Sequence, residues 1–363
     1  MPPDPASLAT QLAPLVAAYC RRPAVRHELG LAEGTSLEAT VLAADALYLT
    51  YLVHTPDGRR WVARLSTGSP LGLSSSKQIA YEARALRFLE PFHIAPQLCY
   101  VDATLYHLPY GFLVMEYLPG ELLNAQNPAH LQQAARLLAR LHSIPIPADS
   151  AFIRNDRPLS AIVEQAAGFL AAYTASSVAQ TEITQLLSTV LRAARASLVN
   201  EPRFHPFALV HTDLQAWTWI VAPPRLALPS IPGVLSISST HPALRLIGWS
   251  KPVLDDPTAD LCSFLAPTMT RLSPNHSVTA AQQEALLTSY LALRPELDTA
   301  DLRDRFATRM RFVYLHAFTQ CAATLALPSS GSATATNDVT LSVTANYLDP
   351  VWMRSLFGDW IEV

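Results

Sequence analysis

The sequence predicts an α+β protein in which a small β-rich lobe is followed by a larger, mainly helical lobe. Residues 36–66 hold three short apolar runs separated by turn residues, which is typical of strands. Beyond residue 129 the apolar residues recur mostly with helical spacing. Between these regions the apolar run at 111–117 reads as a buried strand, and Pro119 and Gly120 then break the chain. We therefore expect an N-terminal lobe over 1–118 and a C-terminal lobe over 119–363.

The N-terminal lobe is predicted to contain two helices and five strands. Helical periodicity predicts a leading helix over 6–24 and a second helix over 77–88, which Pro91 and Pro96 would end. The expected strands are 36–43, 47–55, 60–66, 99–102 and 111–117. Pro56, Asp57 and Gly58 form a turn signal between the second and third strands, so an antiparallel sheet follows.

The C-terminal lobe is predicted to be helical, with a short β region inside it. Amphipathic runs predict helices over 129–142, 162–173, 183–198, 280–293 and 301–325. Strands are expected over 207–210, 217–221 and 244–247. Two segments read as irregular: the Pro/Ser-rich 222–243 and the Ser/Thr/Ala-rich 328–346. The charged stretch from Arg294 to Arg305 alternates in sign and reads as a solvated helix face.

Composition excludes several classes of protein. Half of the 363 residues are hydrophobic and 15% are charged, as expected of a globular chain with a large core. The net charge of −3 offers no basic field for nucleic acid. No signal peptide or membrane span is visible, so we expect a soluble, cytoplasmic protein. The four cysteines are far apart and lack a C-x-x-C pair, which favours free thiols over a zinc site.

Five motifs, in order, resemble those of the aminoglycoside phosphotransferase and choline kinase superfamily. His211, Thr212 and Asp213 follow a predicted strand and resemble its catalytic loop, H-G-D-x-x-x-x-N. Segments 247–249 and 256–261 resemble its I-D-W and G-D-P-x-x-D-L motifs. The other matching segments are the hinge-like 112–120, the helix end 137–142, and 62–65 with Glu82. The resemblance spans residues 36–265 and implies a two-lobed, protein-kinase-like fold.

The resemblance implies a phosphoryl-transfer site with ATP as cofactor and a small molecule as substrate. Such a site positions the nucleotide phosphates, neutralises their charge with Mg²⁺ and aligns a hydroxyl with a carboxylate. Asp213 would be that carboxylate, and His211 would orient its loop. Arg64 would hold the phosphates, with Glu82 fixing its side chain. Backbone groups of Glu116, Tyr117 and Leu118 would bind adenine. In the alternative without catalysis, Asp213 caps its own loop, Arg64 is an ordinary strand residue and Glu82 lies on a helix surface.

Four features depart from the family pattern, and two of them weaken the metal site. The family's Mg²⁺-binding asparagine is Thr218, and the aspartate of I-D-W is Gly248. Mg²⁺ prefers octahedral oxygen ligation with one or two carboxylates, so these changes remove the main ligand. Asp255 is a candidate substitute, with helix capping and loop hydrogen bonding as the alternative. Thr212 replaces the loop glycine, and the nucleotide loop at 43–48 has no glycine at all.

Two functional hypotheses follow. The first is a catalytically impaired kinase homologue, a pseudo-enzyme or module that binds a small molecule or nucleotide. The alternative is an active ATP-dependent kinase that phosphorylates a hydroxyl with Asp213 as base. The long loop at 222–243 would bind a protein partner, or is a tolerated insertion. Trp217, Trp219 and Trp249 flank the expected site and are assigned to core packing.

Overall fold

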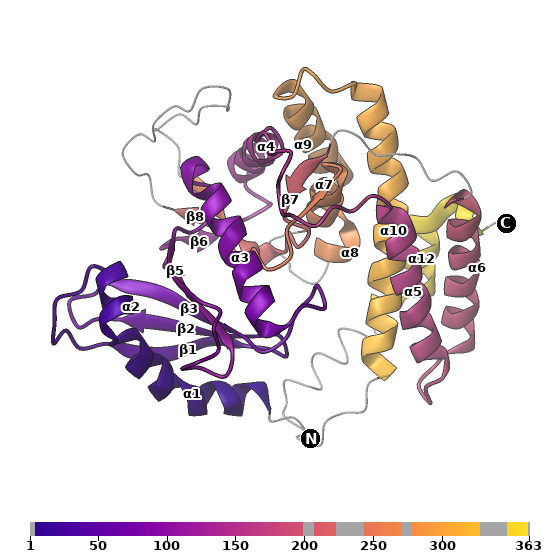
Figure 1. Cartoon of the computed structure of the whole chain (residues 1–363). Helices are drawn as coiled ribbons and strands as arrows, with labels where there is room; N and C mark the ends of the chain where they lie inside the picture. The colour runs from indigo at the N-terminus through magenta and orange to yellow at the C-terminus, as the bar shows by residue number, and fades with distance from the viewer. Residues whose placement is uncertain (1–3, 199–206, 223–242, 271–276, 327–346, 362–363) are drawn as a thin grey trace. The chain divides into compact units, whose positions relative to one another are not determined.

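The computed structural model describes residues 4–198, 207–222, 243–270, 277–326 and 347–361 (Figure 1). The chain divides into two compact units, each made of two segments. The first unit comprises residues 1–123 and 217–252, and the second comprises 124–216 and 253–363. The chain therefore crosses between the units three times.

The first unit is built on a five-stranded antiparallel sheet in the order β1-β2-β3-β5-β4. Its strands are β1 (Glu38–Ala44), β2 (Tyr48–His54), β3 (Arg60–Ser66), β4 (Leu98–Asp102) and β5 (Gly111–Glu116). All five were predicted to within two residues, because alternating apolar residues and turn signals bound each strand. The expected sheet is confirmed.

The leading helix differs from its prediction. A single helix over 6–24 was expected, but α1 (Pro5–Cys20) ends four residues earlier and α2 (Pro23–Glu28) follows it. Pro23 has no backbone N–H to continue a helix, yet it suits a first helical turn, so it starts a new helix. The Asp4 side chain caps the beginning of α1 by accepting from the Ser7 N–H at 2.9 Å.

Helices α1 and α3 (Ser75–Leu89) cover opposite faces of this sheet. Alternate residues of β2, namely Leu49, Tyr51 and Val53, join the hydrophobic cluster that includes α1. On the other face α3 approaches β5 closely at Gly111, where an added Cβ would lie 2.6 Å from the Ile79 side chain. The α3 face also carries Arg64, because Arg64 pairs across the sheet with Thr50 and Leu113.

A returning segment completes the first unit. Strands β6 (Glu121–Leu122), β8 (Trp219–Ala222) and β9 (Ala243–Leu246) form a second antiparallel sheet. The Leu246 N–H donates to the Ile94 carbonyl at 2.8 Å, which ties β9 to the segment before β4. The expected lobe boundary after residue 118 assigns 217–252 to the helical lobe, whereas its contacts group it with the N-terminal sheet. A lobe boundary after residue 118 therefore remains a prediction.

The second unit is mainly helical. Its helices are α4 (Pro128–His142), α5 (Pro158–Thr174), α6 (Thr181–Ser197), α7 (Thr258–Leu265), α8 (Pro267–Thr270), α9 (Ala280–Ala292), α10 (Thr299–Ala326) and α12 (Pro350–Phe357). Figure 1 shows α5, α6, α10 and α12 side by side, and their apolar faces form one buried cluster. Strands β7 (Ala208–Val210) and β10 (Val253–Asp255) form a two-stranded antiparallel ladder. The loop with His211 and Asp213 follows β7, and α7 follows β10.

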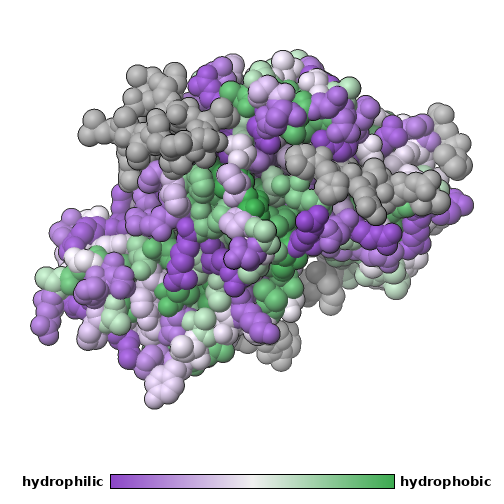
Figure 2. Space-filling model, turned by 45° about the horizontal axis from the view of Figure 1, so that its top comes forward, coloured by the Kyte–Doolittle hydropathy of each residue, from purple (hydrophilic) through white to green (hydrophobic). Residues whose placement is uncertain are grey.

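The five helices expected in this region are present, with ends shifted by at most four residues. The strand expected over 217–221 begins instead with the 3-10 turn η3 (Ala216–Thr218) before β8. The irregular segments expected at 222–243 and 328–346 lie almost entirely outside the described residues. Hydrophilic residues predominate on the face drawn in Figure 2. Within the described ranges, no helix has the length and apolar character needed to cross a bilayer.

Candidate active site

The loop that follows β7 is held by one buried carboxylate. The His211 and Thr212 N–H groups donate to Oδ2 and Oδ1 of Asp260, each at 2.8 Å. Asp260 lies in the first turns of α7 and is fully buried. Thr212 adopts a left-handed backbone with φ of 69°, a conformation that a residue with a Cβ rarely takes. The carboxylate therefore fixes a strained turn at the position where the resemblance places the catalytic loop.

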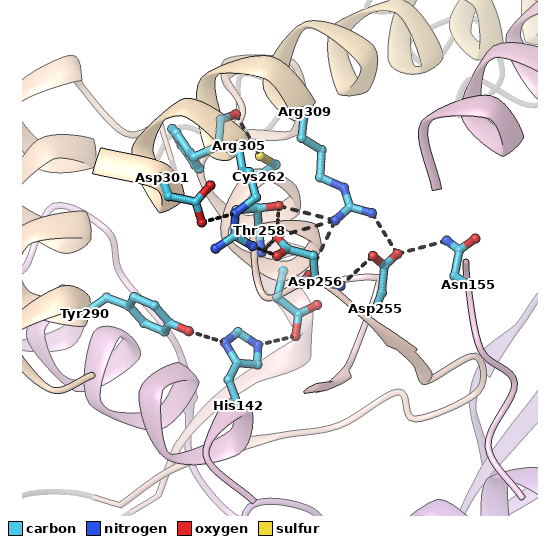
Figure 3. A network of polar contacts seen from close by, with 12 residues as sticks. His142, Asn155, Asp255, Asp256, Thr258, Cys262, Tyr290, Asp301, Arg305 and Arg309 are labelled. Atoms are coloured by element: carbon cyan, nitrogen blue, oxygen red, sulfur yellow. Dashed lines mark hydrogen bonds and ion pairs between the residues drawn. The ribbon is translucent and has the colours of Figure 1, made fainter. Parts of the chain in front are cut away.

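A chain of buried side chains supports Asp260. His142, at the end of α4, has Nε2 3.2 Å from Asp260 Oδ2 and Nδ1 2.9 Å from the Tyr290 hydroxyl on α9 (Figure 3). The Arg294 guanidinium lies 3.2 Å from the same hydroxyl and donates to it. Because an ionised carboxylate only accepts, His142 Nε2–H donates to Asp260 and Nδ1 accepts from Tyr290. In this network the His142 Nε2–H and the Tyr290 hydroxyl each have an acceptor.

The charges of this pair follow from burial and hydrogen bonding together. Burial alone would raise the pKa of Asp260, but hydrogen bonds from His142 and the His211 backbone lower it below its ordinary value. Burial lowers the pKa of His142, although the Asp260 hydrogen bond partly opposes that shift. We assign an ionised Asp260 and a neutral His142 in the folded protein.

His211 and Asp213 are brought together as the sequence predicts. The Asp213 N–H donates to His211 Nδ1 at 3.3 Å, and His211 is fully buried. The next amide, of Leu214, donates to the Ser263 hydroxyl on α7 at 3.2 Å. Because Nδ1 of His211 accepts, a neutral ring carries its proton on Nε2. This arrangement suits the orienting role expected of His211, while the role of Asp213 as base remains a prediction.

Asp255, the proposed substitute metal ligand, is occupied by other partners. Its Oδ2 lies 2.7 Å from Arg309 Nη2 and 2.9 Å from Asn155 Nδ2 (Figure 3). Burial raises the pKa of Asp255 despite the Arg309 charge. These contacts are those of a structural ion pair, and they leave the carboxylate poorly suited to a metal ion.

The neighbouring Asp256 corrects a second expectation. It forms an ion pair with Arg305 of α10 and accepts from the Thr258 N–H at 2.8 Å (Figure 3). Arg305 and Arg294 are 7% and 5% exposed, so the prediction of a solvated face over 294–305 is wrong for both. Arg305 is buried because it reaches the buried carboxylate of Asp256, a tertiary partner that the alternating charge pattern does not reveal.

In the first unit, the structure joins Arg64 and Glu82 as predicted. The Arg64 guanidinium on β3 forms an ion pair with Glu82 on α3, whose side chain is 1% exposed. Burial raises the pKa of Glu82, and the Arg64 charge opposes that shift without reversing it. Among the described residues, Glu82 Oε2 and Arg64 Nε have no hydrogen-bond partner, and both atoms are buried. The expectation of an exposed helix glutamate is therefore excluded, while phosphate binding by Arg64 stays a prediction.

Of the residues expected to form the hinge, Glu116 ends β5, and Tyr117 and Leu118 follow it. The Glu116 side chain accepts from Arg245 Nη1 of β9 at 2.9 Å, and its backbone N–H donates to the Gln97 carbonyl at 2.8 Å. The Arg60 guanidinium lies over the Tyr117 ring, 4.4 Å from its centroid. Leu118 is buried. These contacts rigidify the hinge, and adenine binding by its backbone remains a prediction.

The two positions expected to bind Mg²⁺ flank the β8–β9 ladder: Thr218 ends η3, directly before β8, and Gly248 lies two residues after β9. The Ile247 N–H donates to the Thr218 carbonyl at 2.9 Å, which places Gly248 beside the end of η3. Gly248 has φ of 87°, and Trp249 behind it is fully buried and donates to the Leu246 carbonyl. Gly248 has no side-chain oxygen and Thr218 offers one neutral hydroxyl. These residues do not fit Mg²⁺, which prefers carboxylate ligands.

The loop between β1 and β2 is a closed turn. Asp45 Oδ1 accepts from the Leu47 and Tyr48 N–H groups at 2.7 and 2.9 Å. Nucleotide-binding loops offer such amides to phosphate oxygens. Here a carboxylate of the same chain uses two of them, which agrees with the expectation that 43–48 lacks a phosphate-binding loop.

Sequence reasoning missed several residues of these sites. Tyr290, Arg309 and Asn155 lie in helices or loops whose patterns show only amphipathicity or turns, so nothing in the sequence links them to the loop carboxylates. Trp217 was assigned to the core with Trp219 and Trp249. The latter two are fully buried, but Trp217 is 61% exposed, so that assignment is wrong for Trp217.

The comparisons with known proteins agree with this organisation. A sequence profile described as the phosphotransferase enzyme family matches residues 38–228. No curated protein sequence matches the chain. A macrolide 2'-phosphotransferase type I aligns with a TM-score of 0.55 and 17% identity, covering 96% of this chain and 99% of its own.

Two further solved structures have similar folds. Choline kinase from Cryptosporidium parvum Iowa II has a TM-score of 0.57 and 13% identity, covering 96% of this chain and 99% of its own. An ADP-bound aminoglycoside phosphotransferase, APH(2'')-Ib, has a TM-score of 0.54 and 13% identity, covering 92% and 97%. The fold is therefore the two-lobed, protein-kinase-like fold that the motifs imply. The chain belongs to the phosphotransferase enzyme family.

Proposed function

We propose that this chain is a catalytically impaired phosphotransferase homologue of the cytoplasm, which binds a small molecule or nucleotide without efficient Mg²⁺-dependent phosphoryl transfer. One observation carries the proposal: neither position expected to bind Mg²⁺ has a carboxylate, since Gly248 has no side chain and Thr218 has only a hydroxyl. Asp255 does not supply the missing ligand readily, because Arg309 and Asn155 already bind it.

The chemistry explains why this loss matters. Phosphoryl transfer depends on positioning and on neutralising the charge of the phosphates, and metal ions supply most of that neutralisation. When bound, Mg²⁺ would bridge the terminal phosphates and offset their developing charge. In this chain the Arg64 cation is the one expected phosphate contact that remains, and Glu82 already offsets its charge.

The alternative function, an active small-molecule kinase with Asp213 as base, is favoured by a different observation. The loop of His211 and Asp213 is anchored on Asp260 through two backbone hydrogen bonds of 2.8 Å. An anchored loop supports a catalytic carboxylate, but it would also persist in a protein that has lost catalysis because the same bonds stabilise the fold. We therefore rank this alternative second.

A thermal-shift titration with ATP, with and without Mg²⁺, tests the proposal. Ligand at 100 times its Kd stabilises a protein by about 2.7 kcal/mol, which is readily visible as a rise in Tm. We expect no Mg²⁺-dependent rise for the natural sequence. A clear Mg²⁺-dependent rise, with ATP-dependent phosphorylation of a screened substrate that Asp213→Ala abolishes, would establish the alternative instead.

Restoring the ligands sharpens the test. Gly248→Asp combined with Thr218→Asn should give Mg²⁺-dependent ATP binding, and Gly248→Asn with Thr218→Asn is the matched control. Both residues at 248 must adopt φ of 87° and bear a similar strain, so the pair differs mainly in the carboxylate charge. Equal responses from the two variants would contradict this account of the metal site.

A further inference from the structure

Tyr48 lies over the Arg64 guanidinium on the α3 face of the first sheet. Arg64 pairs with Thr50 across the β2–β3 ladder, so Tyr48, two residues earlier, is its diagonal neighbour on the same face. The Arg64 Cζ atom is 3.9 Å from the centroid of the Tyr48 ring. Tyr48 is 4% exposed. The ring therefore covers one face of the cation and shields it from water.

The backbone around Tyr48 holds it in this position. Asp45 accepts from the Tyr48 N–H, and the Asp45 N–H donates back to the Tyr48 carbonyl at 2.9 Å. The Leu47 carbonyl accepts from the Thr67 and Gly68 N–H groups at 2.9 and 3.1 Å. A Cβ at Gly68 would lie 2.8 Å from the Leu47 side chain, which shows how closely these two segments pack. The turn is thus fixed on both sides.

The segment that follows Gly248 is hydrogen bonded to α3. Gln78 Nε2 donates to the Ser250 carbonyl and the Tyr81 hydroxyl donates to the Pro252 carbonyl, each at 2.6 Å. Gln78, Tyr81 and Glu82 all lie on α3. Burial and the Glu82 charge raise the pKa of Tyr48, so its hydroxyl is neutral. Tyr48 is therefore an uncharged ring enclosed by the strand, α3 and this segment.

The directions in which Arg64 can still bind an anion are few. A guanidinium binds phosphate through the N–H groups at its edge, in its own plane. Nη1 is engaged by Glu82, and Nε is buried. The Arg64 side chain is 12% exposed, so little of its remaining edge is open to a phosphate while the Tyr48 ring lies against the cation.

We propose that Tyr48 is an internal cap that excludes nucleotide phosphates from Arg64, so that removing the ring exposes a binding site for a nucleoside di- or triphosphate. The cap rests on the proposed function, because the resemblance alone assigns Arg64 to phosphates. It adds a named residue, separate from the two metal positions, that weakens metal-free binding of phosphates by Arg64.

The test is ADP binding measured by isothermal titration calorimetry without metal, on the full chain. Tyr48→Ala should bind ADP at least about tenfold more tightly than the natural sequence, because the cation–π contact no longer competes. Tyr48→Phe retains the ring and is the matched control, which should bind as weakly as the natural sequence. Tyr48→Ala with Arg64→Gln should lose the gain. Tyr48→Leu, which preserves apolar packing on the strand, replaces Tyr48→Ala if circular dichroism shows the latter unfolded.

The outcomes separate the two proposals. If Tyr48→Ala and Tyr48→Leu are folded and neither binds ADP more tightly, the cap is wrong and the impaired-homologue proposal is unaffected. A gain that persists without Arg64 also overturns the cap. If the natural sequence already binds ADP tightly, the cap is again wrong. Only Mg²⁺-dependent phosphorylation by the natural sequence would overturn the proposed function.

Discussion

In each unit of this protein a fully buried carboxylate organises the candidate site, and Asp260 and Glu82 differ in how completely they are hydrogen bonded. Asp260 in the second unit accepts from His142 and from the backbone N–H groups of His211 and Thr212. Glu82 in the first unit is paired with Arg64, and its second oxygen has no partner. Accordingly the pKa of Asp260 is lowered and that of Glu82 is raised.

The difference distinguishes the loop after β7, which keeps its hydrogen bonds, from the expected phosphate position, where the Glu82 carboxylate is less completely hydrogen bonded. Burial disfavours the charged form of a carboxylate in both units, so the number of hydrogen-bond donors decides whether its pKa is lowered or raised. In the second unit that number is sufficient to fix the catalytic-type loop. In the first unit, where phosphates and metal would bind, the ion pair is incomplete, Tyr48 covers the cation and Gly248 lacks a side chain.

The largest effect should come from removing the better-bonded carboxylate. Asp260→Ala leaves three buried donors without an acceptor, so we expect a loss of about 3 to 5 kcal/mol in the free energy of unfolding. Urea denaturation measures this loss, and Asp260→Asn, which retains one acceptor oxygen, is the control and should lose less. A loss below about 1 kcal/mol for Asp260→Ala would remove the contrast between the units.

The pH dependence of stability should reveal the neutral His142. Its folded pKa is below the ordinary value of 6.5, so below that pH the unfolded chain binds a proton that the folded protein resists. The His142 contribution is therefore complete above pH 6.5 and is lost as the pH falls, with a slope of at most about 1.4 kcal/mol per pH unit.

Unfolding measured between pH 8 and 5 on the natural sequence and on His142→Gln checks this, since the difference between their slopes isolates His142 from Glu82 and Asp255. Those two carboxyls have raised pKa values and act in the opposite direction. Identical slopes for the two proteins would show that the pKa of His142 is the same in the folded and unfolded states, which would contradict the lowered pKa.

The incompletely bonded carboxylate should tolerate neutralisation. In Glu82→Gln the amide oxygen still accepts from Arg64, and the desolvation of a charge is avoided, so we expect a change of about 1 kcal/mol or less. Chemical denaturation of this variant beside Asp260→Asn compares the same chemical change in both units. A loss for Glu82→Gln equal to that for Asp260→Asn would show that donor number does not distinguish them.

The smallest expected effect is a gain in stability. Thr212 has φ of 69°, where a residue with a Cβ is strained. Thr212→Gly should relieve that strain and raise the free energy of unfolding by about 0.5 kcal/mol after the entropic cost of glycine. Thr212→Ala, which keeps a Cβ, is the control and should show no such gain. The melting temperatures of Thr212→Gly and Thr212→Ala, each compared with that of the natural sequence, measure the effect.

Local pattern predicted most of the fold and part of the site. The five strands of the first sheet and the amphipathic helices follow from alternation and helical spacing, and the His211–Asp213 and Arg64–Glu82 pairs follow from motif order. The burial of Arg305 against Asp256 and the position of Tyr48 over Arg64 depend on partners on other elements of the chain. Periodicity is blind to such contacts, so these residues could be found only in three dimensions.

The interleaved arrangement of the units has a consequence for how the chain is made. Residues 217–252 belong with the N-terminal sheet, so a ribosome must release about two thirds of the polypeptide before the first unit holds all of its strands. Until then β6 has no partner in β8, and the sheet of β6, β8 and β9 cannot form while α4, α5 and α6 are synthesised. This late strand pairing leaves the nascent chain prone to aggregation, so we expect chaperones to bind it during synthesis.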